Sequence, residues 1–133
     1  MNADDTVTLR VPREPGYRSL LHLVLGGIAS RGDMSVDALD DLQLAVDNLL
    51  AEDQSAGEDV IMSVSLGDKK VCITIEALTD THLRHNLAHR QLIAGTEDKR
   101  MDMCLLLDSL VDGYAVHDRE SGAYAVELRK QVR

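Results

Sequence analysis

Bulky aromatic side chains are almost absent from this chain of 133 residues. It contains no Phe and no Trp, and its only aromatic residues are Tyr17, Tyr114 and Tyr124. Hydrophobic residues nevertheless make up 44% of the chain, an ordinary share for a globular protein. We therefore expect a single domain over residues 1–133 with one aliphatic core, in which residues 1–5 are disordered.

An excess of positive charge is also missing. The chain has 14 Lys and Arg against 23 Asp and Glu, which gives a net charge of −9. Nucleic-acid binding needs a positive field and, for single strands, aromatic side chains on which bases stack. Direct nucleic-acid binding is therefore disfavoured. The acidic surface suits a basic protein partner, or simply keeps the protein in solution.

Cysteines are few, and long apolar runs are lacking. Cys72 and Cys104 each lie in an apolar stretch, which is typical of buried free thiols rather than of a disulfide. No run approaches the roughly 18 apolar residues that a membrane span needs, and the acidic start does not resemble a signal peptide. These absences predict a cytoplasmic protein without a membrane span.

The hydrophobic periodicity predicts an α+β fold. Strands are expected over residues 6–12, 60–66, 69–77, 113–118 and 123–130, and helices over 15–31, 35–53 and 98–112. Residues 78–97 have weak periodicity and are expected to be partly helical or mobile. This order indicates a two-layer α/β sandwich, with helices stacked on one face of a mixed, mostly antiparallel sheet.

Two glycine positions carry local expectations. Gly67-Asp68 is expected to form the turn between the second and third strands. Gly26-Gly27 lie inside the first helix, where each glycine costs about 1 kcal/mol relative to Ala. Close packing against a neighbouring element, or a ligand, is the expected compensation.

Three stretches of the sequence resemble one family. They are T-V-T-L-R-V-P-R-E-P-G-Y-R-S-L-L-H-L-V near the start, D-A-L-D-D-L-Q-L-A-V-D-N-L-L-A-E over residues 37–52, and L-L-L-D-S-L-V-D-G-Y-A-V with S-G-A-Y-A-V-E-L-R-K near the end. They are similar to the opening strand and helix, the N-box helix, and the last helix and hairpin of anti-sigma-factor serine kinases. These kinases belong to the histidine-kinase-like (GHKL) ATPase superfamily.

The resemblance implies a Bergerat-type fold and an intracellular role in bacterial partner switching. In such pathways a kinase-like protein sequesters a sigma factor and releases it when an antagonist protein binds instead. Members of the family usually work as dimers and hold ATP with Mg²⁺. A homodimer of this chain could use Met34, Val36 and the outer sheet edge.

The N box of the family has a Glu as general base and, four residues later, an Asn that holds Mg²⁺. The aligned residues here are Asn48 and Glu52, so the two residue types are exchanged. The spacing places both on one helix face. Glu52 could contact a cation and is the candidate catalytic residue, whereas Asn48 cannot accept a proton. A solvated helix face explains the pair at least as well.

Both glycine boxes of the family are changed. The first supplies an Asp for the adenine amino group and glycines that let the backbone approach the nucleotide. Residues 76–81 contain no glycine, and Glu76 or Asp80 is the candidate replacement for the Asp. The second box corresponds to residues 101–104, where Asp102 would oppose the charge of a phosphate. The residues of a degenerate nucleotide pocket would be Asn48, Glu52, Glu76 and Asp80.

Three histidines follow the first glycine box. His82, His85 and His89 would lie along one side of a helix, and imidazole clusters are common ligands of zinc and nickel. A solvated helix face or a His-rich partner surface is the simpler interpretation, and a metal-responsive binding module is the alternative.

The sequence as a whole predicts an anti-sigma-factor-like regulator. It would bind a sigma factor, an antagonist protein or both, with impaired or no ATP binding and with impaired or no catalytic activity. The alternative within the family is an active serine/threonine protein kinase that uses ATP and Mg²⁺ to phosphorylate the antagonist.

Overall fold

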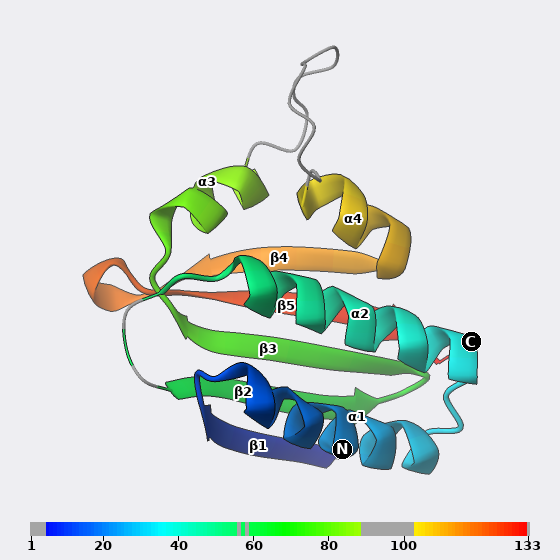
Figure 1. Cartoon of the computed structure of the whole chain (residues 1–133). Helices are drawn as coiled ribbons and strands as arrows, with labels where there is room; N and C mark the ends of the chain where they lie inside the picture. Colours follow the sequence, from blue (N-terminus) through cyan, green and yellow to red (C-terminus); the bar gives the residue numbers. More distant parts are fainter. Residues whose placement is uncertain (1–4, 56, 58, 89–102, 133) are drawn as a thin grey trace.

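The computed structural model describes residues 5–55, 57, 59–88 and 103–132 of the chain. One sheet in the order β1-β2-β3-β5-β4 carries the described helices on one face (Figure 1). The strands are β1 (Asp5–Pro12), β2 (Asp59–Gly67), β3 (Lys70–Leu78), β4 (Gly113–Asp118) and β5 (Tyr124–Gln131). The helices are α1 (Arg18–Arg31), α2 (Val36–Glu52), α3 (Thr81–Ala88) and α4 (Met103–Leu110), with 3-10 turns η1 (Pro15–Tyr17) and η2 (Glu120–Gly122).

The predicted two-layer α+β architecture is confirmed. Every expected strand agrees with an observed one to within one residue at each end, and residues 78–97 do contain a helix, α3. All pairs between the described strands are antiparallel, so the sheet is not mixed. Of residues 1–5, which were expected to be disordered, residues 1–4 lie outside the described residues, whereas Asp5 belongs to β1 and pairs with Leu66, so for Asp5 the prediction is wrong.

The turn between β2 and β3 lies one residue later than predicted. Gly67 pairs with Lys70 in the ladder, so Asp68 and Lys69 form the two-residue loop, and Lys69 takes a φ of 65°. A left-handed backbone is unfavourable for Lys. A one-residue slip of the hairpin would, however, turn every apolar side chain of one strand away from the core. The strand register therefore outweighs the turn preference of one glycine.

The core lies between the sheet and the inner faces of the helices. α2 begins where predicted, because the Ser35 hydroxyl accepts a hydrogen bond from the backbone N–H of Ala38 at 3.1 Å. The aliphatic core is confirmed, and Tyr124, which is 2% exposed, is its largest side chain. The described part of the chain includes no helix long and apolar enough to cross a membrane.

Gly26 and Gly27 are not explained by packing within the described chain. A Cβ atom added at either position would have no heavy atom of another described element within 4 Å. The expectation that close packing compensates these glycines is therefore wrong for the described residues. Compensation by a ligand stays a prediction.

Candidate functional site

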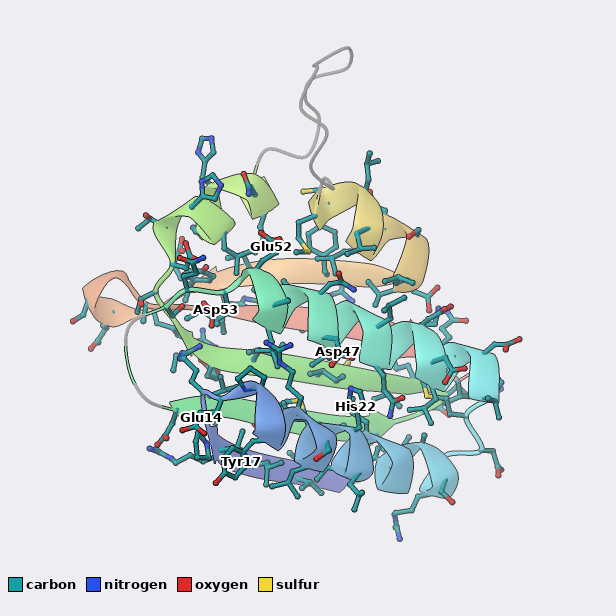
Figure 2. The ribbon with its side chains drawn as sticks, viewed as in Figure 1. Glu14, Tyr17, His22, Asp47, Glu52 and Asp53 are labelled. Atoms are coloured by element: carbon teal, nitrogen blue, oxygen red, sulfur yellow. The ribbon has the colours of Figure 1, made fainter. Side chains whose placement is uncertain are left out.

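The predicted N-box residues lie on the C-terminal half of α2. Asn48 Nδ2 donates a hydrogen bond to the backbone oxygen of Leu44 at 2.8 Å, within the same helix. Glu52 is exposed and ends the helix (Figure 2). The Nδ2 group of Asn48 is thus used inside α2, and Glu52 is open to solvent.

Glu76 lies on the face of the sheet that the helices do not cover. Its neighbour Ile75 is 1% exposed and points into the core, so Glu76 points the other way. Its carboxylate oxygens accept hydrogen bonds from the Arg119 guanidinium at 3.0 and 3.2 Å. The sheet therefore separates Glu76 from the helix side, where Asn48 and Glu52 lie.

Asp80 caps the N-terminal end of α3. Its Oδ1 accepts hydrogen bonds from the backbone N–H groups of His82 and Leu83 at 2.9 and 3.1 Å, and its Oδ2 accepts one from Gln54 at 2.7 Å. Burial raises the pKa of Asp80, but these backbone donors and the nearby His82 outweigh burial and hold the pKa below its usual value. Asp80 therefore ties α3 to the loop that follows α2.

The region of the second glycine box is described from Met103 onward. Met103 and Cys104 begin α4 and are buried. The Cys104 thiol donates a hydrogen bond to the backbone oxygen of Asn86 at 3.2 Å. This contact joins the start of α4 to α3. Asp102, the residue expected to oppose a phosphate, lies outside the described residues.

The histidines are only partly described. His82 and His85 lie on α3 and are exposed, whereas His89 lies outside the described residues. Within the described ranges, no group of three or more His, Cys, Asp or Glu side chains could hold a metal ion. The three-histidine site stays a prediction.

A polar junction built on Arg13 and Asp53 was missed by the sequence reasoning. Arg13 forms an ion pair with Asp53, and their side chains are 14% and 2% exposed. Arg13 also donates a hydrogen bond to the backbone oxygen of Ala77 at 2.8 Å. Ala77 has a φ of 67° at an irregularity in the β3–β5 pairing. Arg13 thereby joins the end of β1 to the end of α2 and to β3.

Ser55 and Tyr124 extend this junction to α3. The Ser55 hydroxyl donates to the Asp53 carboxylate and accepts hydrogen bonds from the backbone N–H groups of Thr79 and Asp80 at 2.7 and 3.0 Å. The Tyr124 hydroxyl donates to the Asp80 backbone oxygen at 2.7 Å. Burial first, and then the charges of Asp80 and Asp53, raise the pKa of Tyr124, which keeps it protonated. The Asp-x-Ser spacing, typical of a local turn, was the one available signal.

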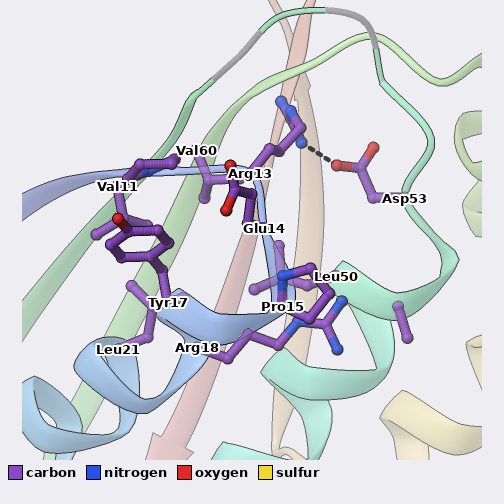
Figure 3. A pocket seen from close by; sticks show the side chains of 12 residues that line it. Val11, Arg13, Glu14, Pro15, Tyr17, Arg18, Leu21, Leu50, Asp53 and Val60 are labelled. Atoms are coloured by element: carbon purple, nitrogen blue, oxygen red, sulfur yellow. Dashed lines mark hydrogen bonds and ion pairs between the residues drawn. The ribbon is translucent and has the colours of Figure 1, made fainter.

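A cavity of about 230 Å³ opens beside this junction (Figure 3). It lies between the end of β1, the first turn of α1 and the end of α2. Its walls include apolar side chains from β1, β2, α1 and α2, and its charged groups are Arg13, Glu14, Arg18 and Asp53. None of the four residues predicted for a nucleotide pocket is among the described residues that line this cavity. The four are Asn48, Glu52, Glu76 and Asp80.

Comparison with known proteins supports the resemblance over part of the chain. Serine-protein kinase RsbW from Listeria monocytogenes and from Listeria innocua are each 50% identical to this chain over 42 residues. The match covers 32% of this chain and spans only 27% of the length of each relative. No family model matches the chain. About a third of the chain is thus similar to a segment of serine-protein kinase RsbW.

Proposed function

We propose that this chain is an anti-sigma-factor-like regulator that acts by binding proteins and does not use ATP. Its similarity to part of serine-protein kinase RsbW supports a role in partner switching, with a sigma factor or an antagonist protein as partner. The net charge of −9 supports a protein partner over a nucleic acid. In this proposal the protein acts by binding a partner through its surface and catalyses no reaction.

The proposed impairment or loss of ATP binding is supported chiefly by the hydrogen bonds of Asp80. Asp80 already accepts hydrogen bonds from three backbone N–H groups, so most of its acceptor capacity serves the protein's own backbone, and turning the carboxylate towards an adenine amino group would disturb these bonds. Breaking these bonds would uncap α3 and release the loop after α2, which costs stability. Glu76 offers no replacement, because it pairs with Arg119 on the opposite face of the sheet.

Calorimetry tests the loss of ATP binding. We expect no heat when ATP with Mg²⁺ is titrated into the chain, while serine-protein kinase RsbW from Listeria monocytogenes serves as the positive control. Micromolar binding would show that the nucleotide site is functional.

A pull-down tests the protein partner. Sigma factors and antagonist proteins from the same genome are passed over the immobilised chain without ATP, and at least one of them should be retained. Retention of none would overturn the regulatory role.

An active serine/threonine kinase is the second candidate, because the similar proteins are named as serine-protein kinases and Glu52 is exposed. Transfer of radiolabelled phosphate from ATP to the antagonist would support it, and Glu52→Ala should then abolish the signal.

Two further expectations belong with the proposal. Val36 is 72% exposed and could contact a second copy in a homodimer, whereas Met34 packs against the core. A metal-responsive role would require stabilisation by zinc that is lost in His85→Ala.

A further inference from the structure

The cavity beside the junction contains two charged side chains that no described residue neutralises. Arg13 and Asp53 neutralise each other in their ion pair. Glu14 and Arg18 also line the cavity, and neither forms an ion pair within the part of the chain that is described. Glu14 is exposed and Arg18 is half-buried. Figure 3 shows them on opposite sides of Pro15.

The rest of the cavity is suited to a small apolar group. Pro12, Pro15 and Ala51 line it and are exposed apolar residues, whereas Val11, Leu21 and Val60 also line it but are only 1% to 5% exposed. Tyr17 lies at its edge and leaves 39% of its surface open to solvent. The volume of about 230 Å³ is below the roughly 300–1,000 Å³ of pockets for drug-sized ligands. The occupant should therefore be small, with an apolar body.

We propose that this cavity binds a free α-amino acid with an apolar side chain, such as leucine. The Arg18 guanidinium would take the carboxylate, and the Glu14 carboxylate would take the ammonium group. The exposed apolar part of the lining, Pro15, Tyr17 and Ala51, would contact the side chain. A molecule with a single charge leaves Glu14 or Arg18 unpaired, and a phosphate or a dicarboxylate is repelled by Glu14. This site shares no residue with the predicted nucleotide pocket and goes beyond the proposed function.

Calorimetry with L-leucine on the full chain tests the site, with L-isoleucine and L-phenylalanine as further probes. We expect a dissociation constant of about 0.1–1 mM. Isocaproate lacks the ammonium group, isoamylamine lacks the carboxylate, and glycine lacks the side chain. Each should bind at least about tenfold more weakly, because one set of contacts is lost. No binding of any apolar amino acid at about 10 mM, or equal binding of leucine and isocaproate, would overturn the proposal.

Two variants locate the site. Arg18→Gln and Glu14→Gln should each weaken leucine binding about tenfold or more. Arg10→Gln and Glu120→Gln remove exposed charges that do not line the cavity, so they should bind leucine as the parent chain does. Leucine binding that is unchanged in both cavity variants overturns the assignment. Circular dichroism checks the folding, and if a cavity variant does not fold, the comparison of leucine with isocaproate and isoamylamine on the parent chain decides.

Discussion

Two regions near the C-terminal end of α2 treat their polar groups differently. On the side that the family motifs single out, Asn48 bonds to its own helix and Asp80 caps α3. On the side of the cavity, Arg13 and Asp53 form a nearly buried ion pair. Asn48 thus serves its own helix, and Asp80 caps α3 and holds one further backbone N–H, that of Gln54. Arg13 and Asp53, which belong to neither the N box nor the glycine boxes, join β1, α2 and β3 and line the cavity. In this chain, the residues at the family's motif positions are not the residues that line the cavity.

The largest effect is expected at the buried ion pair. Asp53→Ala should lower the free energy of unfolding by about 3–5 kcal/mol, because it leaves the Arg13 charge buried without a partner. It also removes the acceptor of the Ser55 hydroxyl. Urea denaturation at pH 7 measures the loss.

The exposed pair between Arg10 and Asp59 is the matched control. Its side chains are 66% and 38% exposed, so Asp59→Ala should cost no more than about 1 kcal/mol. If Asp53→Ala costs no more than Asp59→Ala, the contrast between the two regions fails.

The next effect is expected at Asp80, on the motif side. Asp80→Ala should lower the free energy of unfolding by about 1–2 kcal/mol through loss of the cap of α3. Asp80→Asn keeps a capping oxygen and should cost less. If Asp80→Ala proves harmless, the carboxylate does not hold the backbone and remains available to a ligand.

The same residue predicts a pH dependence. The pKa of Asp80 is lower in the folded than in the unfolded chain, so its contribution to stability is complete above the unfolded pKa. That contribution is lost as the pH falls below about 4, where the unfolded chain takes up the proton first. Denaturation at several pH values should therefore show a smaller decline at acid pH in Asp80→Asn than in the parent chain.

Features that depend on local sequence pattern, such as the buried face of a strand and the start of a helix, could be predicted from the sequence. Alternating apolar residues placed Val71, Ile73 and Ile75 in the core, and Ser35 marked the start of α2; both predictions are confirmed. The same alternation predicts that Glu76 points away from the core, as the structure shows, which conflicts with its candidate role as a contact for adenine on the helix side.

The junction could not be predicted in the same way. Arg13 and Asp53 lie 40 residues apart and meet only because β1, α2 and β3 end at one place. No spacing in the sequence encodes that meeting. The cavity depends on the same three-dimensional arrangement and was likewise out of reach.

The next prediction concerns Gly26 and Gly27, which lie in the part of α1 that does not line the cavity. Gly26→Ala and Gly27→Ala should each raise the free energy of unfolding by about 0.5–1 kcal/mol, because a methyl group has room and Ala favours a helix. Gly122→Ala is the control and should destabilise, since Gly122 has a φ of 81°. If the α1 variants gain stability but lose binding to a protein partner, the glycines serve that partner rather than the fold.

The smallest effect is expected at Glu76. Its ion pair with Arg119 lies on the uncovered face of the sheet, where water and salt screen the two charges. Glu76→Gln should therefore leave the denaturation midpoint unchanged within error at moderate salt. The variant also sharpens the comparison of the two regions, because Glu76 was a candidate contact for adenine. If the chain binds ATP and Glu76→Gln weakens that binding, Glu76 must reach a nucleotide despite its position. The motif side would then be a functional nucleotide site, in which polar side chains give up hydrogen bonds to the backbone and form them with the ligand instead.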